Sequence, residues 1–189
     1  IVNDESLMIL KSIMSFLRYL LIIFFVTVVL ITSETFAKKA AIVIDFDTKE
    51  VLFEVNANTK NYPASLTKIM TLYILFDQLE KGELTNQSKL KVSRIAASRS
   101  PSKLYLEEGS SIKVEDAVMA LIIKSANDVA TVVAENISGS EKEFAKLMTN
   151  YARKLGMENT TFKNASGLPN RAQLTTARDI SILSHALIF

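Results

Sequence analysis

The stretch from Leu66 to Leu79 is apolar around almost the whole circumference of the helix that it predicts. Pro63 suits the first turn, where a missing N–H costs nothing, and Gly82 supplies the stop after Lys81. A helix that is apolar on every side is buried in the middle of a domain. Side chains at its N-terminus are therefore expected to be held rigidly.

Shorter patterns around this helix predict a mixed α/β domain. The apolar runs 40–46 and 51–55 are separated by four polar residues, which is typical of a β-hairpin. Residues 83–111 are polar and irregular, and short strands are expected around Leu90 and Leu104. This order fits an α/β layer with a helical insertion. Helical patterns follow at 114–124, 128–137, 141–155 and 177–188.

Several of these helices carry end signals. Ser140 and Glu143 have the spacing of a capping box, and Gly156 ends the helix that they begin. Thr175 or Thr176 is expected to cap the last helix. Because one hairpin is a marginal sheet by itself, further strands are expected after this helix, and the fold is interpreted as incomplete at its C-terminus.

The N-terminal segment predicts export. Residues 19–32 are fourteen residues without a charge, they follow basic residues, and Thr35 and Ala37 are small residues at the −3 and −1 positions of a cleavage site. This order predicts a signal peptide over residues 1–37, with the periplasm or cell envelope of a bacterium as destination. The alternative is a retained anchor, although about 18–20 apolar residues are usually needed to span a bilayer. Translation is expected to start at Met8 or Met14, which would leave an upstream extension of up to thirteen residues.

Composition excludes several classes of site. The chain has no cysteine, so disulfides and thiolate metal sites are ruled out, and its single histidine, His185, excludes a metal site built on several histidines. A packed or solvated His185 is expected, without a catalytic role. The net charge of +2 provides no clustered basic face for nucleic acid.

Ser65 and Lys68 form a Ser-x-x-Lys pair at the start of the buried helix. Positions i and i+3 lie on one helix face, so the amine can reach the hydroxyl, and burial lowers a lysine pKa toward the range of a base. These are the parts of an acyl-transfer site. A plain helix cap with a solvated lysine is the alternative. Three more pairs lie in polar surroundings that would not desolvate the lysine: Ser88/Lys91, Ser100/Lys103 and Ser110/Lys113.

Ser125-Ala126-Asn127 breaks an otherwise apolar pair of helices. Buried polar side chains need partners, so Ser125 and Asn127 are expected to face a cleft. A kink that only satisfies backbone groups remains the alternative. Asp128, the next residue, is expected to act as a local helix cap.

PASLTKIMT and LIIKSANDVATVVAE together resemble the serine D-alanyl-D-alanine carboxypeptidases, which are low-molecular-mass penicillin-binding proteins. FKNASGLP and TTARDISIL add to the resemblance, which covers residues 38–189. It implies the β-lactamase/DD-peptidase-like fold, an antiparallel sheet flanked by helices plus a helical subdomain.

The resemblance also implies a mechanism. Ser65 would attack the carbonyl between the terminal D-alanines of a peptidoglycan stem peptide, and Lys68 would accept its proton. Ser125 would relay a proton to the leaving amine, and Asn127 would hold the substrate amide or Lys68. β-Lactams would acylate Ser65, and no metal or organic cofactor is implied. Association with a membrane surface is left open.

The family's third motif, Lys-Thr-Gly, does not occur in the sequence. The resemblance assigns that strand to carboxylate binding and to the oxyanion hole, where one lost donor costs about 10²–10³ in rate. The domain at 38–189 is therefore expected to be truncated before this motif. Expressed alone, the 189-residue chain is expected to be inactive or poorly folded.

Rival functions remain. A class A β-lactamase shares the first two motifs but also needs a glutamate for deacylation, and FKNASGLPN contains no acid. Endopeptidase or transpeptidase action on cross-links would depend on the shape of the pocket. A catalytically dead, exported cell-wall-binding protein or the product of a broken gene is the alternative from another class.

Overall fold

The computed structural model describes residues 4–31 and 39–188, and the chain divides into two compact units, residues 1–37 and 38–189. In the first unit, helix α1 (Asp4–Ile31) contains most of the apolar run of the expected signal peptide. The small residues of the expected cleavage site, Thr35 and Ala37, lie outside the described residues. Among the described residues, no helix combines the length and apolarity needed to cross a membrane.

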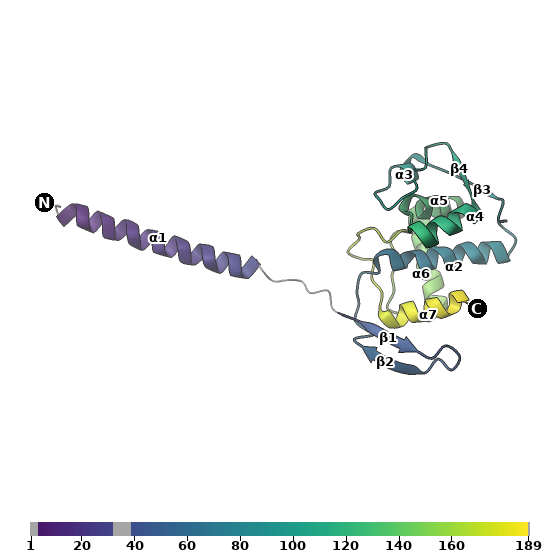
Figure 1. Cartoon of the computed structure of the whole chain (residues 1–189), viewed down its shortest axis with the longest axis horizontal. Helices are drawn as coiled ribbons and strands as arrows, with labels where there is room; N and C mark the ends of the chain where they lie inside the picture. Colours follow the sequence, from purple (N-terminus) through teal and green to yellow (C-terminus); the bar gives the residue numbers. More distant parts are fainter. Residues whose placement is uncertain (1–3, 32–38, 189) are drawn as a thin grey trace. The chain divides into compact units, whose positions relative to one another are not determined.

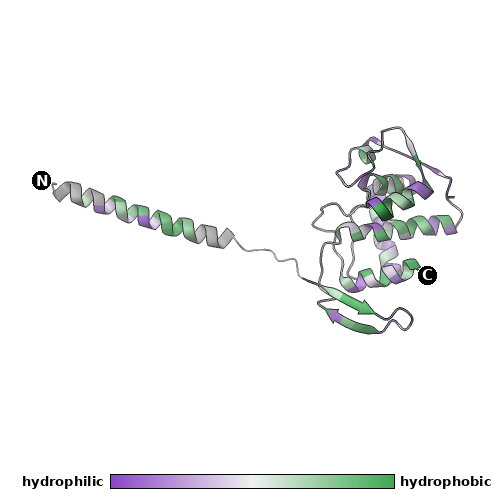
Figure 2. Ribbon diagram, in the orientation of Figure 1, coloured by the Kyte–Doolittle hydropathy of each residue, from purple (hydrophilic) through white to green (hydrophobic). Residues whose placement is uncertain are grey.

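The second unit begins with the predicted β-hairpin. Strands β1 (Ala41–Ile44) and β2 (Val51–Val55) pair antiparallel, with a register irregularity at the last pair. The Asp45 carboxylate closes the turn by accepting hydrogen bonds from Thr48 N and Oγ1, both at 2.8 Å. Both strands are largely hydrophobic in Figure 2, and every residue of β2 is exposed. The hairpin prediction is confirmed.

Helix α2 (Thr67–Glu80) runs through the middle of the domain, as its sequence predicts (Figure 1). A short 3-10 turn, η1 (Ala64–Leu66), leads into it, so Ser65 lies one turn before the regular helix. Met70, Ile74 and Leu75 are completely buried, since α5, α6 and α7 all pack on α2. Burial is less complete than the sequence suggests, because Leu66 and Phe76 are exposed.

The segment after α2 forms a second small sheet. Strand β3 (Lys89–Lys91) is the expected strand at Leu90, and it pairs antiparallel with β4 (Ser111–Lys113). The prediction of a strand around Leu104 is wrong. The N–H of Leu104 donates instead to the Asp128 carboxylate, so the backbone there is held in an irregular loop.

A cluster of helices forms the rest of the unit, and α5 lies in its core. The break predicted at Ser125 is present: the helical turns end there in a left-handed residue with φ 53°, and a new helix starts at Asn127. The bounds are α3 (Arg94–Ala97), α4 (Val114–Met119), the π-helical turn η2 (Ala120–Lys124), α5 (Asn127–Ser138), α6 (Glu141–Lys154) and α7 (Ala177–Ile188).

Two of the expected helix caps are present, and the structure shows which side chains make them. Ser140 Oγ accepts from the N–H of Glu143 at 3.2 Å, which is one half of the capping box, while the Glu143 side chain pairs with Lys146. Thr176, the second of the two candidates, caps α7 by accepting from the N–H of Asp179 at 3.0 Å. Both helices therefore begin where their sequences predict.

Figure 1 shows the hairpin, α7, α2 and α5 in succession across the second unit. This is the expected mixed α/β arrangement, with a helical part beside a sheet layer. Residues from α2, α5 and α6 dominate the core, and its largest fully buried side chains include Phe144, Phe162, Met148 and Met157. The N-terminal end of α2 is thereby fixed against a close-packed interior.

Candidate active site

Ser65 and Lys68 lie together at the start of α2. Lys68 Nζ is 3.5 Å from Ser65 Oγ, and it donates a shorter hydrogen bond of 2.6 Å to the carbonyl oxygen of Ser166. Ser65 is exposed, whereas Lys68 is only 3% exposed. The arrangement presents the Ser65 hydroxyl to solvent and keeps the neighbouring Lys68 amine out of water.

Burial lowers the pKa of Lys68 from 10.5 to about 8. Desolvation is the cause, because a charged ammonium loses its hydration in the interior of the domain. At pH 7 a pKa near 8 leaves about a tenth of the amine neutral, whereas an ordinary lysine has well under a thousandth. The solvated-lysine alternative therefore does not describe this residue.

Ala64, the residue before Ser65, has φ 45°, which an alanine adopts only at a cost of about 1–3 kcal/mol. The loop at 164–168 packs directly on this strained backbone. A Cβ on Gly167 would lie 1.8 Å from the Ala64 carbonyl oxygen, so only glycine fits there. Gly167 has φ 87°, which is also a conformation that favours glycine.

Side chains on either side hold the loop at 164–168 in place. Thr71, one turn after Lys68, donates to the Ala165 carbonyl oxygen at 2.7 Å, and both residues are buried. Asn164 Oδ1 accepts from the N–H of Gly167 at 2.7 Å, while its Nδ2 donates to Leu168 O at 2.8 Å. The Ser166 carbonyl that meets Lys68 is thus rigidly positioned.

Local sequence does not point to Ser166 or Thr71 as parts of this site. A backbone carbonyl has no side-chain signature, and the two segments that meet are 98 residues apart at the Lys68–Ser166 contact. The available signal is Gly167, a glycine within a polar loop between two segments of the predicted core.

The second motif lies at the junction between η2 and α5. Ser125 is half-buried, and its hydroxyl makes no hydrogen bond to any other described residue. Asn127 is buried, and its Nδ2 donates to Ser100 O at 3.0 Å while its N–H donates to Ser102 O at 2.7 Å. The contact between Asn127 and Lys68 suggested by resemblance is not among the hydrogen bonds of residues 39–188.

Asp128 does more than the local capping expected of it. Its carboxylate accepts from the N–H of Val129 at 2.9 Å, which is a local bond, but also from Leu104 at 3.0 Å and Leu106 at 3.2 Å. Asp128 is fully buried, so this carboxylate anchors a distant loop.

The expected packed state is found for His185, whose ring lies 5.3 Å from that of Phe46.

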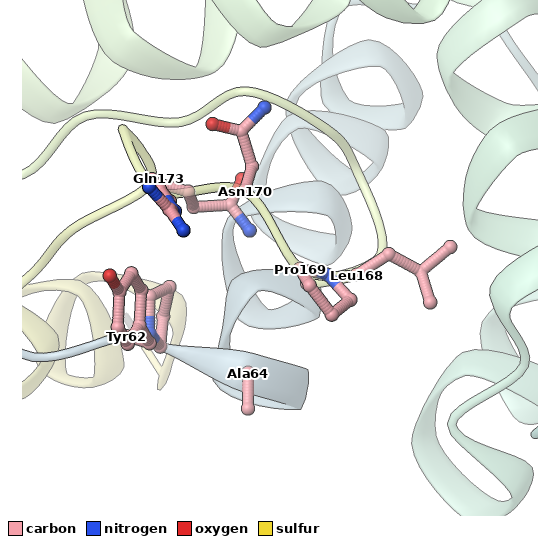
Figure 3. A pocket seen from close by; sticks show the side chains of 9 residues that line it. Tyr62, Ala64, Leu168, Pro169, Asn170 and Gln173 are labelled. Atoms are coloured by element: carbon pink, nitrogen blue, oxygen red, sulfur yellow. The ribbon is translucent and has the colours of Figure 1, made fainter. Parts of the chain in front are cut away.

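A pocket of about 380 Å³ lies next to the Ser65 turn. Residues 62–64 line it on one side and residues 167–171 with Gln173 on the other (Figure 3). Its walls are mainly apolar, and they include the Tyr62 ring and the Leu168 and Pro169 side chains. In the described part of the chain, no group of three or more His, Asp or Glu side chains is placed to hold a metal ion.

Comparison with known proteins gives a consistent result. A family model described as D-alanyl-D-alanine carboxypeptidase matches residues 28–189. D-alanyl-D-alanine carboxypeptidase DacF from Bacillus subtilis is 39% identical over 150 residues, and DacC from Escherichia coli is 38% identical over 156 residues. Each match covers 79% of this chain and 39% of the relative, so the chain spans about two fifths of their length.

Solved structures share the fold of this chain. D-alanyl-D-alanine carboxypeptidase DacD from Francisella tularensis superposes with a TM-score of 0.79 and 36% identity, over 82% of this chain and 37% of that one. Penicillin-binding protein D2 from Listeria monocytogenes, in its ampicillin-bound form, gives a TM-score of 0.71 and 33% identity. That match covers 82% of this chain and 63% of the Listeria protein.

Proposed function

The chain belongs to the D-alanyl-D-alanine carboxypeptidase family, and from this premise we propose that the protein removes the terminal D-alanine from peptidoglycan stem peptides. The reaction proceeds through an acyl-enzyme on Ser65. The observation that carries the proposal is the buried amine of Lys68, 3.5 Å from the Ser65 hydroxyl, with its pKa lowered to about 8. A base must be neutral at working pH to accept a proton, and burial supplies that condition.

In the first half of the reaction, the neutral Lys68 amine takes the hydroxyl proton as Ser65 Oγ attacks the carbonyl carbon of the penultimate D-alanine. The Oγ–C bond forms, and the C–N bond to the last D-alanine breaks. Ser125 gives its hydroxyl proton to the leaving nitrogen and is reprotonated from the Lys68 ammonium. Among the described residues, the Ser125 hydroxyl has no hydrogen-bond partner, which supports this role because the group is available to a ligand.

In the second half, water attacks the acyl ester and the shortened peptide leaves as a carboxylate. Lys68 takes one proton of the water and returns it to Ser65 Oγ as the ester bond breaks, and the product acid loses the other proton to solvent. Asn127 is proposed to position the substrate amide. Its side-chain amide is anchored on Ser100 O, which keeps the Ser125-Asn127 segment fixed beside the bound peptide.

We also propose that β-lactams acylate Ser65. The ampicillin-bound form of the Listeria relative supports this assignment, as does the solvent-exposed position of Ser65. Residues 1–37 are proposed to direct export, which would bring residues 38–189 to the peptidoglycan as part of the catalytic domain. The family match to cell-wall enzymes supports this location.

The test uses the full-length gene product with Ser65→Ala, and Ser110→Ala as the matched control, because Ser110 starts another Ser-x-x-Lys pair. D-Alanine release from a peptide ending in D-Ala-D-Ala and a fluorescent penicillin adduct are both measured. Parent and control are expected to show both activities, and Ser65→Ala neither. A parent protein that forms no adduct and releases no D-alanine would support the cell-wall-binding alternative instead.

A further inference from the structure

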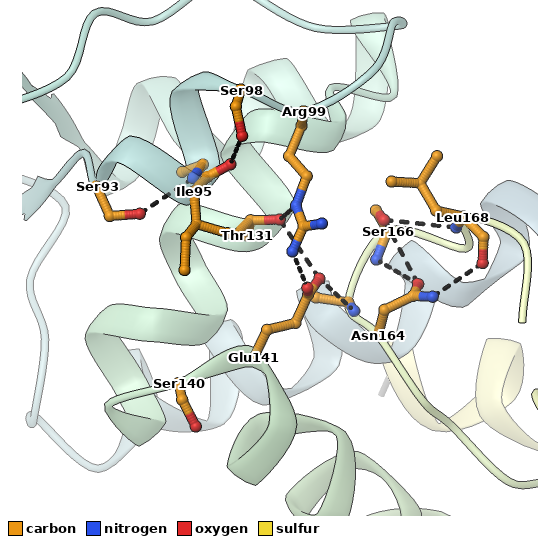
Figure 4. A network of polar contacts seen from close by, with 12 residues as sticks. Ser93, Ile95, Ser98, Arg99, Thr131, Ser140, Glu141, Asn164, Ser166 and Leu168 are labelled. Carbon is orange, nitrogen blue, oxygen red and sulfur yellow. Dashed lines mark hydrogen bonds and ion pairs between the residues drawn. The ribbon is translucent and has the colours of Figure 1, made fainter.

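An ion pair outside the two motifs belongs to a polar network that reaches the loop at 164–168 (Figure 4). Arg99, just after α3, pairs with Glu141, the first residue of α6. Their side chains are only 25% and 14% exposed. Thr131 on α5 joins the pair, since its hydroxyl accepts from Arg99 Nε at 2.9 Å and donates to Glu141 Oε1 at 3.3 Å.

Glu141 reaches the loop that meets Lys68. Its Oε1 accepts from the N–H of Ala165 at 3.1 Å. The residue after Ala165 is Ser166, whose carbonyl receives the 2.6 Å hydrogen bond from Lys68 Nζ. One carboxylate oxygen thus holds the residue immediately before the one whose carbonyl orients the candidate base.

Arg99 is linked to the second motif through its neighbour in the chain. The residue after it, Ser100, offers its carbonyl to Asn127 Nδ2 at 3.0 Å. Arg99 directly precedes the residue whose carbonyl holds Asn127. Glu141 is hydrogen-bonded to the residue that precedes Ser166, whose carbonyl holds Lys68. The pair connects the Ser65–Lys68 turn and the Ser125–Asn127 junction through a short path of bonded groups.

We infer that the Arg99–Glu141 ion pair is a positioning pair that sets the two catalytic motifs relative to each other, an inference that rests on the proposed function. A partly buried ion pair adds little net stability, because desolvation offsets most of the attraction. Removing one partner nevertheless leaves the other charge uncompensated, so the geometry is held strongly. Catalytic groups need this kind of control, since a misplacement of about 1 Å can cost about 10²-fold in rate.

The test compares Glu141→Ala and Glu141→Gln with Glu143→Ala in the full-length gene product. Glu143 is a matched control because it is two residues away on α6, carries the same charge and pairs with Lys146, with both side chains more than half exposed. Glu141→Gln keeps an acceptor for Ala165 N and removes the charge opposite Arg99. The rate of penicillin acylation of Ser65 is followed against pH, together with the thermal midpoint of each variant.

Glu141→Ala is expected to slow acylation at pH 7 by about 10- to 100-fold and to shift the midpoint of the pH profile upward, because a loosened loop lets water reach Lys68. The acylation rate and pH midpoint of Glu141→Gln should lie between those of Glu141→Ala and the parent. Those of Glu143→Ala should match the parent. If Glu141→Ala lowers only the thermal midpoint, and its acylation rate and pH profile equal those of Glu143→Ala, the pair is merely structural and the inference is overturned.

A second readout separates this inference from the proposed function. The Lys68 amine is labelled with acetic anhydride across pH and quantified by peptide mass spectrometry, which requires no turnover. If the parent forms no penicillin adduct, the proposed function fails. An upward shift of the Lys68 labelling midpoint in Glu141→Ala, absent in Glu143→Ala, would still support the positioning role, and identical midpoints would overturn it.

Discussion

Gly167→Ala should damage the candidate site far more than its small size suggests. The added Cβ would lie 1.8 Å from Ala64 O and 2.4 Å from Ala64 C. Even a tight contact of 3.0 Å requires the two backbones to separate by about 1.2 Å. Ala64 adjoins Ser65, and Gly167 adjoins Ser166, so this separation acts directly on the contacts of Lys68.

Gly156→Ala separates the clash from the backbone strain. Gly156 has φ 86°, almost the same as the 87° of Gly167, but nothing lies within 4 Å of its added Cβ. The free energy of unfolding of each variant should fall by about 1 kcal/mol, because alanine is strained at a positive φ. Gly167→Ala should lose a further 1–3 kcal/mol or so from overpacking, and about 10²-fold in acylation rate from the displaced loop.

The assay combines urea unfolding with penicillin acylation at a temperature where both variants are folded. Gly156→Ala is expected to acylate at the parent rate. Equal losses of stability in the two variants, together with an unchanged acylation rate in Gly167→Ala, would refute the close approach of the loop to the Ser65 turn.

Three further predictions concern buried polar groups. The pKa of Lys68 is near 8 in the folded protein and 10.5 when unfolded, so the unfolded chain binds one more proton between these pH values. Relative to Lys68→Met, the free energy of unfolding of the parent, measured in urea, should therefore rise by up to about 3 kcal/mol from pH 8 to 10.5. Stabilities of the two proteins that change in parallel with pH would contradict the burial of Lys68. Acylation by the parent should rise with pH to a midpoint near 8, whereas a midpoint near 10 would contradict a desolvated base. Asp128→Ala should cost about 3 kcal/mol by orphaning the N–H groups of Leu104 and Leu106, while Asp116→Asn, an exposed control, should stay within about 0.5 kcal/mol of the parent.

Much of the fold could be predicted because its signals are local. The hairpin follows from two apolar runs around a polar turn, and the burial of most of α2 follows from its all-round hydrophobicity. The proximity of Ser65 and Lys68 follows from helical spacing alone. Each of these features is decided within fewer than twenty residues.

What could not be predicted depends on contacts between distant segments. Leu104 is a residue type that is common in strands, but its N–H donates to the Asp128 carboxylate, 24 residues later, and is not available for strand pairing. Asn127 has several available partners, and only the folded chain selects the Ser100 carbonyl. Glu141 looks like an ordinary first-turn acid of α6, because its link to Ala165 requires the loop to fold back on it.

The contact between Lys68 and Ser166 also has a consequence for the order of events during synthesis. The carbonyl that accepts from the Lys68 amine lies 98 residues downstream, so a nascent chain that ends before Ser166 lacks this contact. Reactivity is thereby coupled to the completion of a long-range contact rather than to the formation of α2. We therefore expect the proposed nucleophile to become competent only after the loop at 164–168 has packed against the turn that bears it.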